Sequence, residues 1–280
     1  MPAGSVDLRP VHPRVSVSAI STRSWTLDED LAFYAAAGIA NVGLSWAKLD
    51  AHGVTDAAAR VNDAGVRVTN VLALAGHVLD DPASWPAARG RINGAVEAAA
   101  ATGAPCVVVT SGRPGALAWE AAADAWADVM EPCASRARAA GLVLALEHTN
   151  SLRVDLSFVH TLRDALDLAA RLDMGVCMEC NTCWMERGVE HTIAANVDRL
   201  ALVQVSDFVV GTFATPDRVV PGDGDIPLER LLRAVVDAGY GGVFDLEVIG
   251  PRIDAEGYEV AIPRGVRATE RLLEAVGVSA

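Results

Sequence analysis

Three apolar segments in the second half of the chain each end in a glutamate. They are Leu144 to Glu147, Val176 to Glu179 and Phe244 to Glu247. A fourth segment, Leu202 to Val205, carries Gln204 at the equivalent place. If these segments are parallel strands, their carboxyl ends meet around one pocket. Three carboxylates buried together are costly without a compensating cation, so the pattern predicts a divalent metal site.

The predicted metal ligands are Glu147, Glu179, Gln204 and Glu247. Carboxylate and amide oxygens without a histidine favour a hard cation, Mn²⁺ or Mg²⁺, over zinc. Carboxylate ligands can also move protons, and Glu147 and Glu247 stand on strands that approach a substrate from different sides. We therefore predict both as catalytic groups in proton transfer beside a carbonyl, where the metal holds the enediolate.

Six further side chains follow predicted strands or lie in the loops beyond them. His148 comes directly after Glu147 and is predicted as a catalytic base or substrate contact, with a supporting or loop role as the alternative. Four of the others are predicted substrate contacts: His77, Arg252, and Trp46 and Trp184 as apolar walls, with core or rim packing as the alternative for the two tryptophans. The last is Arg218, in the loop before Pro221.

Two other motifs are better explained by packing and turns. Cys177, Cys180 and Cys183 have the spacing of metal ligands but lack a second pair, and the first two point to opposite faces of a strand. Gly222 and Gly224 lack the Lys and Ser/Thr of a phosphate-binding loop, so they indicate a tight turn.

The elements that position these residues form eight strand-helix units, a pattern typical of a parallel sheet. Most of the strands are apolar on both faces, as strands between a barrel interior and a helical ring must be. At 280 residues, the chain has the usual length of one (β/α)8 TIM barrel, so we predict a single domain over residues 1–280. The predicted strands are Val15 to Ala19, Asn41 to Leu44, Val66 to Leu72, Cys106 to Thr110, Val143 to Glu147, Gly175 to Glu179, Leu202 to Val205 and Val243 to Val248.

Local signals mark the first helix and one long loop. Thr26 and Glu29 form a capping box at the start of the first helix, and Gly38 ends it. The segment Val209 to Asp225 is rich in Gly and Pro and lacks a helical pattern. It predicts an ordered loop above the seventh strand, at the end of a barrel where long loops usually cover a substrate.

Composition excludes several other classes of protein. A formal charge of −13 without a basic stripe argues against nucleic acid as a partner. No apolar run approaches the roughly 18 residues of a membrane span, and the first residues lack a secretory signal, so we expect a cytoplasmic protein. The five cysteines, an odd number, predict reduced thiols. Lys48 is the only lysine, so any Schiff-base chemistry would rest on it alone.

The chain resembles the xylose-isomerase-like barrels of the sugar phosphate isomerase and epimerase superfamily. The motifs that carry the resemblance are Ala145 to His148, Val203 to Asp207, Pro221 to Ile226, Gly239 to Gly242 and Leu246-Glu247. The resemblance implies one divalent metal held from four strands, and two outer glutamates that shuttle a proton. It also implies that Arg218 contacts substrate oxygens.

The sequence departs from the family pattern at three positions. Glu179 stands where the family has Asp, and Gln204 where it usually has His, although Gln is also seen in the hydroxypyruvate-isomerase-like branch. Thr182 stands where epimerases often place a His. DNA repair nucleases of the superfamily use a larger, His-rich zinc cluster, which this chain lacks.

The leading hypothesis is a metal-dependent isomerase or epimerase acting on a small sugar, polyol or keto acid. A first alternative is a β-eliminating lyase or dehydratase acting on a keto-sugar, an inosose or a 3-keto-glycoside, with His148 or His77 protonating the leaving oxygen or carbon. A second alternative is a non-catalytic sugar-binding or partner subunit with an impaired metal site. The resemblance also implies a homo-oligomer, a dimer or a tetramer.

Overall fold

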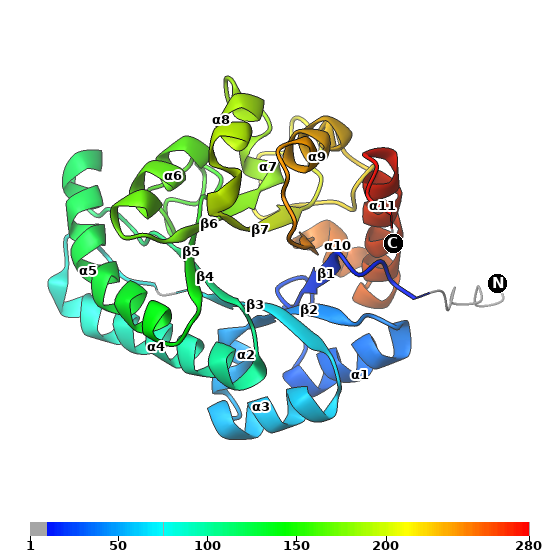
Figure 1. Ribbon diagram of the computed structural model, residues 1–280, viewed down its shortest axis with the longest axis horizontal. Coiled ribbons are helices and arrows are strands. Elements are labelled where there is room, and N and C mark those ends of the chain that lie inside the picture. Colours follow the sequence, from blue (N-terminus) through cyan, green and yellow to red (C-terminus); the bar gives the residue numbers. More distant parts are fainter. Residues whose placement is uncertain (1–9, 75, 280) are drawn as a thin grey trace.

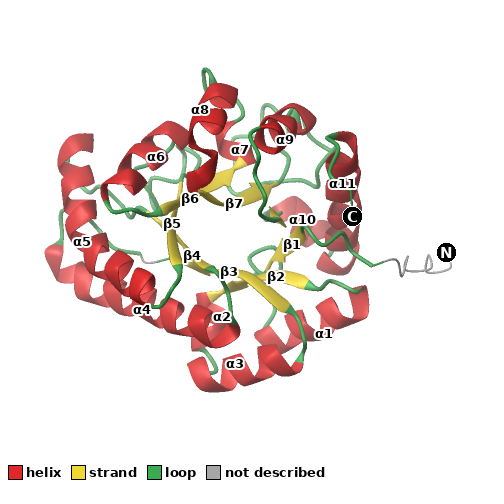
Figure 2. Cartoon of the chain, in the orientation of Figure 1, coloured by secondary structure: helices red, strands yellow, loops and turns green. Residues whose placement is uncertain are grey.

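Eight parallel strands close into one barrel, each hydrogen-bonded to the next in chain order and the last to the first. The computed structural model describes residues 10–74 and 76–279. The strands form a ring enclosed by helices (Figures 1 and 2), which confirms the predicted (β/α)8 barrel. Their bounds are β1 Val15–Ser18, β2 Asn41–Ser45, β3 Arg67–Ala73, β4 Cys106–Thr110, β5 Val143–Glu147, β6 Gly175–Glu179, β7 Leu200–Val205 and β8 Phe244–Leu246.

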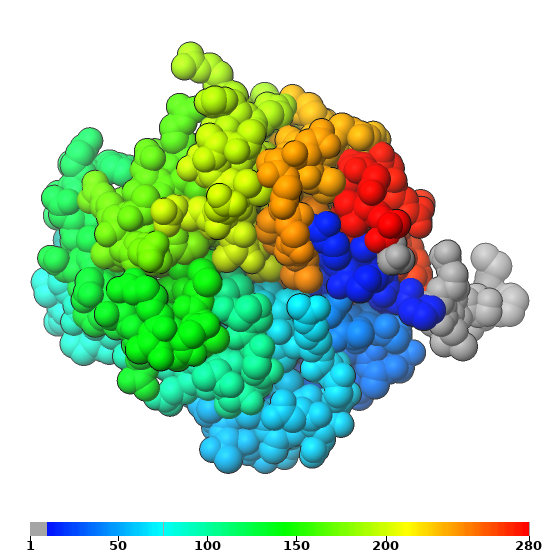
Figure 3. Space-filling view, in the orientation of Figure 1, coloured from blue at the N-terminus to red at the C-terminus, as the bar shows by residue number. Residues whose placement is uncertain are grey.

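The helices connect successive strands along the outside of the barrel. α11 contacts both β1 and β8, so the first and last parts of the barrel adjoin (Figure 3). Two short 3-10 helices lie at Pro82–Ser84 and Val197–Arg199. The α-helices are α1 Leu27–Ala37, α2 Trp46–Asp50, α3 Val54–Asp63, α4 Trp85–Thr102, α5 Trp119–Ala139, α6 Leu162–Arg171, α7 Cys180–Cys183, α8 Val189–Asn196, α9 Leu228–Asp237, α10 Pro251–Glu256 and α11 Tyr258–Ala275.

The capping signals predicted for the first helix are present. The Glu29 backbone N–H donates to Thr26 Oγ1 at 3.3 Å, and the Thr26 N–H donates to Glu29 Oε2 at 2.7 Å. Gly38 ends the helix with φ 67°, a left-handed conformation that glycine adopts without steric cost. Residues 209–225 contain no helix, as their Gly and Pro content predicts.

Strand period places the polar groups directly above an apolar barrel interior. Side chains two residues apart share a face of a strand, so Glu147 lies above Ala145 and Glu179 lies above Cys177. Ala145 and Cys177 belong to a compact interior cluster with Leu72, Cys106, Val108 and Leu202. The strands are staggered, so Glu179 pairs in register with Gln204, whereas Glu147 pairs with Cys177.

The cysteines serve packing rather than metal binding or disulfides. All five are free and buried. Burial raises the pKa of the Cys106 thiol to about 12 and raises those of Cys177 and Cys180 as well. These thiols are therefore protonated and unreactive at neutral pH.

The described helices include none with the length and apolar character needed to cross a bilayer.

Two glycines of α4 offer a matched test of how this helix packs. A Cβ on Gly94 would lie 2.6 Å from Trp46 ring carbons, whereas a Cβ on Gly90 would meet nothing within 4 Å. We expect Gly94→Ala to lower the free energy of unfolding by about 1–3 kcal/mol through overpacking. Gly90→Ala should raise it by roughly 0.5–1 kcal/mol, because alanine restricts the unfolded chain. Urea unfolding measures both, and equal effects would contradict this packing.

Candidate active site at the carboxyl ends of the strands

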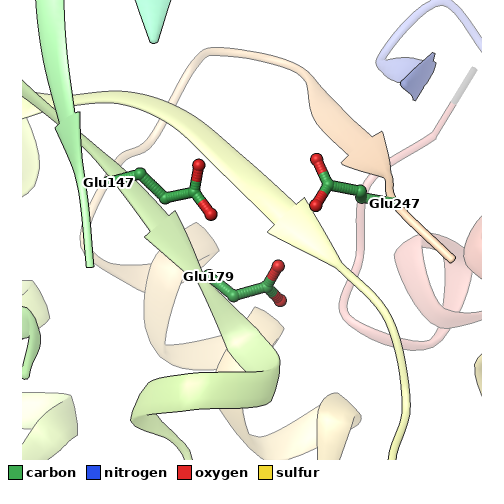
Figure 4. Close-up of side chains that lie close together, drawn as sticks. All are labelled: Glu147, Glu179 and Glu247. Carbon is green, nitrogen blue, oxygen red and sulfur yellow. The ribbon is translucent and has the colours of Figure 1, made fainter. Parts of the chain in front are cut away.

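Three buried glutamates meet at the carboxyl ends of β5, β6 and β8. Oxygen atoms of Glu147, Glu179 and Glu247 lie within 4.8 Å of one another. Figure 4 shows their carboxylates turned toward a common centre from three strand ends. Glu147 and Glu247 line a cavity of about 510 Å³, whereas Glu179 lies beneath it, fully buried. The structure thus brings together the three carboxylates that the sequence places at strand ends.

Arg218 supplies a positive charge at the centre of this cluster. Its Nη1 lies 2.6 Å from Glu179 Oε2 and 2.7 Å from Glu247 Oε1, and it donates to the Glu247 carbonyl at 3.1 Å. Burial lowers the pKa of Arg218, but the charges of Glu179, Glu247 and Glu147 outweigh it and raise the pKa above its usual value. The guanidinium therefore stays protonated and offsets one of the three negative charges.

Glu179 and Glu247 are also held by uncharged donors. Glu247 Oε2 accepts from Gln204 Nε2 at 2.5 Å and from Ser18 Oγ at 3.2 Å. Glu179 Oε1 accepts from the Asn181 backbone N–H at 2.9 Å and from Ser206 Oγ at 3.4 Å. These contacts fix both carboxylates in orientation.

Glu147 has a different environment from the other two glutamates. Within the part of the chain that the structure describes, its carboxylate has no hydrogen-bond or ion-pair partner. Burial, and then the charge of Glu247, raises the pKa of Glu147 well above its ordinary value of 4.5. Burial also raises the pKa of Glu179, to about 7, against the opposing charge of Arg218. Glu147 is therefore the carboxylate that most readily takes up a proton.

Asp207 positions the loop that carries Arg218. Its carboxylate accepts four backbone N–H groups, with donor distances between 2.8 and 3.2 Å, from Phe208, Gly222, Gly224 and Ile226. A Cβ on Gly224 would lie 2.4 Å from Asp207 Oδ1, so only glycine fits there. Sequence analysis identified this motif as a turn but did not include Asp207 among the site residues. The sequence feature that could have identified Asp207 is its position just after the seventh strand and before the glycine-rich loop.

The two predicted histidines lie behind the cavity rather than on its surface. His148 is buried, and its Nε2 accepts from the Glu179 backbone N–H at 3.2 Å. Burial lowers the pKa of His148 to about 3 and that of His77 to about 4, so both are neutral. The ring of His77 packs against Gly112, where a Cβ would lie 2.4 Å from its Nε2. Neither histidine lines the cavity.

Three other predicted substrate contacts also lie away from the cavity lining. Trp46 is buried against α4 and Trp184 packs against the core. Arg252 lies on α10, where it pairs with Asp217 at 3.4 Å and with Thr212 Oγ1 at 3.1 Å. Arg218 is the predicted substrate contact that does line the cavity. The apolar walls are formed instead by aliphatic side chains, which sequence analysis did not single out.

The donor set fits a hard divalent cation. The three carboxylates converge within 4.8 Å, and Gln204 Oε1 is buried without a hydrogen-bond partner. Carboxylate and amide oxygens are ligands that such cations prefer. Arg218 leaves two negative charges of the cluster uncompensated, which matches one divalent ion. Glu147, Glu179, Gln204 and Glu247 are the residues that would hold it.

Comparison with known proteins identifies relatives by family and by fold. Residues 31–271 match the family model of the xylose isomerase-like TIM barrel. No curated protein matches the chain in sequence. A solved structure from Sinorhizobium meliloti 1021 superposes with a TM-score of 0.84 at 22% identity, over 93% of this chain and 98% of the other.

Two further solved structures share the fold. The IolI protein, solved with a bound zinc atom, has a TM-score of 0.74 at 19% identity, over 94% of this chain and 98% of the other. The D-psicose 3-epimerase from Clostridium cellulolyticum H10, solved with D-tagatose, has a TM-score of 0.74 at 14% identity, over 94% of this chain and 99% of the other.

The raised carboxyl pKa values predict how stability depends on pH when no metal is bound. Between the ordinary value of 4.5 and about 7, the folded protein retains a proton on Glu179 that the unfolded chain has lost. The free energy of unfolding should therefore fall as pH rises through this window, by about 1.4 kcal/mol per pH unit for each such proton. Glu179→Gln should reduce the slope.

Urea unfolding at pH 5, 6 and 7 in a chelating buffer measures this slope. Glu190→Gln on α8 is the matched control, since this side chain is 45% exposed and should leave the slope unchanged. Equal slopes in the wild type and Glu179→Gln would show that Glu179 ionises in the folded protein as it does in the unfolded chain.

Proposed function

Because the chain belongs to the xylose isomerase-like TIM barrel family, we propose that it is a divalent-metal-dependent isomerase or epimerase of a sugar, polyol or keto acid. The reaction is proton abstraction beside a carbonyl through an enediolate. The observation that carries the proposal is a cluster of three buried carboxylates at one cavity, in which Arg218 pairs with Glu179 and Glu247 but not with Glu147. Such clusters of buried ionisable groups with shifted pKa values are typical of catalytic sites.

Glu147 is the proton acceptor in this proposal. It lines the cavity, and in the described structure its carboxylate oxygens accept no hydrogen bond from the protein. Burial raises the pKa of Glu147, which makes its carboxylate a stronger base than that of an exposed glutamate. One carboxylate that takes and returns the proton on the same face suffices for a 1,2-isomerisation.

Glu247 has a different role, although sequence analysis paired it with Glu147 as a second catalytic group. Its oxygens accept from Arg218, Gln204 and Ser18, so they are already engaged by the protein and less available than those of Glu147 to take a proton from a substrate. We infer that Glu247 holds cations rather than shuttling a proton. Epimerisation needs a donor on the opposite face of the substrate, so this arrangement favours isomerisation.

The proposed metal is Mn²⁺ or Mg²⁺, held by Glu147, Glu179, Gln204 and Glu247. When bound, it would polarise the substrate carbonyl and stabilise negative charge on the oxygens. Arg218 contacts the carboxylates through Nη1, and among the described contacts its other N–H groups have no partner. Arg218 lines the cavity, and we infer that these N–H groups donate to substrate oxygens.

The two alternatives from sequence analysis have less support. A lyase with His148 or His77 as proton donor lacks the needed contact, because the cavity lining in the described residues contains no histidine. A non-catalytic binding protein would have no use for an unpartnered carboxylate beside two carboxylates that Arg218 already pairs. The substrate is proposed to be a small molecule, while a homo-oligomer and a cytoplasmic location stay predictions.

Proton exchange in heavy water tests the roles of the glutamates. With Mn²⁺ or Mg²⁺ present, wild-type protein and a panel of keto-sugars should show deuterium uptake beside the carbonyl by NMR. Glu147→Gln should slow this exchange about 10²–10⁴-fold, the usual contribution of a general base. Glu247→Gln should slow it less, with activity recovering at higher metal concentration.

Glu190→Gln serves as the surface control and should exchange at the wild-type rate. Undiminished exchange in Glu147→Gln would contradict its role as the base. No exchange with any keto-sugar, in a protein that holds its metal, would favour the non-catalytic alternative.

A further inference from the structure

The cavity has two halves of different chemistry. One half is formed by Glu147, Glu247 and Arg218, at the ends of β5 and β8 and on the loop after β7. The other is formed by Ile20 after β1, by Leu72 and Leu74 at the end of β3, and by Ile249 after β8. Arg23 also lies on this side, but its guanidinium pairs with Asp254.

The apolar lining continues from the floor of the cavity to its mouth. Leu72 is only 6% exposed and packs in one cluster with Ile20, whereas Leu74 is 44% exposed. Across the cavity, Leu152 on the loop after β5 is 56% exposed, and Phe208 lines the cavity after β7. Apolar side chains therefore line the same cavity as Glu147, both at its mouth and near its floor.

A free sugar would be poorly matched to this lining. Its hydroxyls point outward on every side, and those facing Ile20, Leu72 and Ile249 would lose their hydrogen bonds to water without replacement. The cavity volume of about 510 Å³ also lies within the range of roughly 300–1,000 Å³ that holds drug-sized ligands. The cavity is thus large enough for a sugar that carries a ring-sized apolar group, and its lining is more apolar than polar.

We propose that the substrate carries an apolar, ring-sized substituent on its polyhydroxylated, carbonyl-bearing part, as in a glycoside with an aromatic aglycone. This inference rests on the proposed function, because it uses the carboxylates to orient the polar part. The apolar ring lies between the Ile20–Leu72–Leu74 side and Leu152. The polar part then reaches Glu147 and Arg218.

The position of the apolar lining favours a substrate over a second copy of the chain. A flat protein surface would contact Leu74 and Leu152 at the mouth but would not reach Leu72, which is nearly buried beside the floor. A ligand that enters the cavity contacts both levels at once. The continuity from mouth to floor is therefore the feature that identifies the occupant.

Binding of two matched glucosides tests the inference without requiring turnover. Phenyl β-D-glucopyranoside should bind the Mn²⁺-loaded protein at least tenfold more tightly than methyl β-D-glucopyranoside, measured at millimolar concentrations by saturation-transfer NMR. Tenfold corresponds to about 1.4 kcal/mol, which burial of roughly 55 Å² of apolar surface supplies. The phenyl protons should receive the strongest transfer.

Two variants locate the contact. Leu74→Ser should remove most of the preference for the phenyl glucoside, while Phe213→Ser should retain it, since Phe213 is 89% exposed and lies outside the cavity lining. Glu147→Gln should also retain the preference, which separates this inference from the proposed chemistry. Absence of proton exchange in the wild-type protein would overturn the proposed function and leave the phenyl preference standing.

Three results would overturn the inference. The first is equal binding of the two glucosides, or no binding of the phenyl glucoside. The second is a preference that survives Leu74→Ser. The third is a fall in molar mass by light scattering in Leu74→Ser, which would show that a second copy covers the mouth of the cavity.

Discussion

The contact of Arg218 with Glu179 and Glu247 is the interaction on which the rest of the site depends. Three carboxylates within 4.8 Å, all nearly or fully buried, would repel one another strongly in a medium of low polarity. Arg218 lies 2.6 and 2.7 Å from two of them and leaves the third, Glu147, without a direct partner. Removing one member of a buried ion pair typically costs about 3–5 kcal/mol, so the cluster and Arg218 must be retained together.

The fold supplies this contact by two devices. Strand period and stagger bring the glutamates of three strands to one level, above an interior of small apolar side chains. Asp207 then gathers four backbone N–H groups of the following loop, which brings Arg218 over the barrel. Four hydrogen bonds to one buried carboxylate hold this part of the loop in a single conformation, so the loop has a rigid anchor. The position of the Arg218 charge therefore depends on the backbone conformation of the loop that Asp207 holds.

Much of the fold and the centre of the site could be predicted from sequence. The eight strands show as apolar runs, and a glutamate at the end of such a run must lie at the carboxyl edge of the barrel. Side chains that follow strands at other positions were harder to place. His77, His148 and Trp46 lie close to strand ends in sequence, but each turns into the packing around the barrel. Sequence spacing fixes how far a residue is from a strand end, not whether its side chain faces the cavity or the helices.

The partners of each glutamate were also beyond sequence reasoning. Glu147 and Glu247 both end an apolar run, yet Arg218, Gln204 and Ser18 converge on Glu247, whereas Glu147 has no partner among the described residues. These partners come from parts of the chain far apart in sequence, so only the closed barrel brings them together. The apolar half of the cavity likewise combines residues after β1, β3 and β8.

Calorimetric titration of the metal-stripped protein with Mn²⁺ tests the central claim, that the carboxylate cluster and Arg218 together form a divalent cation site. We predict one ion per chain, and loss of that binding in a Glu147→Gln, Glu247→Gln double variant that remains folded. Absence of binding in folded wild-type protein would contradict the claim. Arg218 would then be the cation that the three carboxylates require.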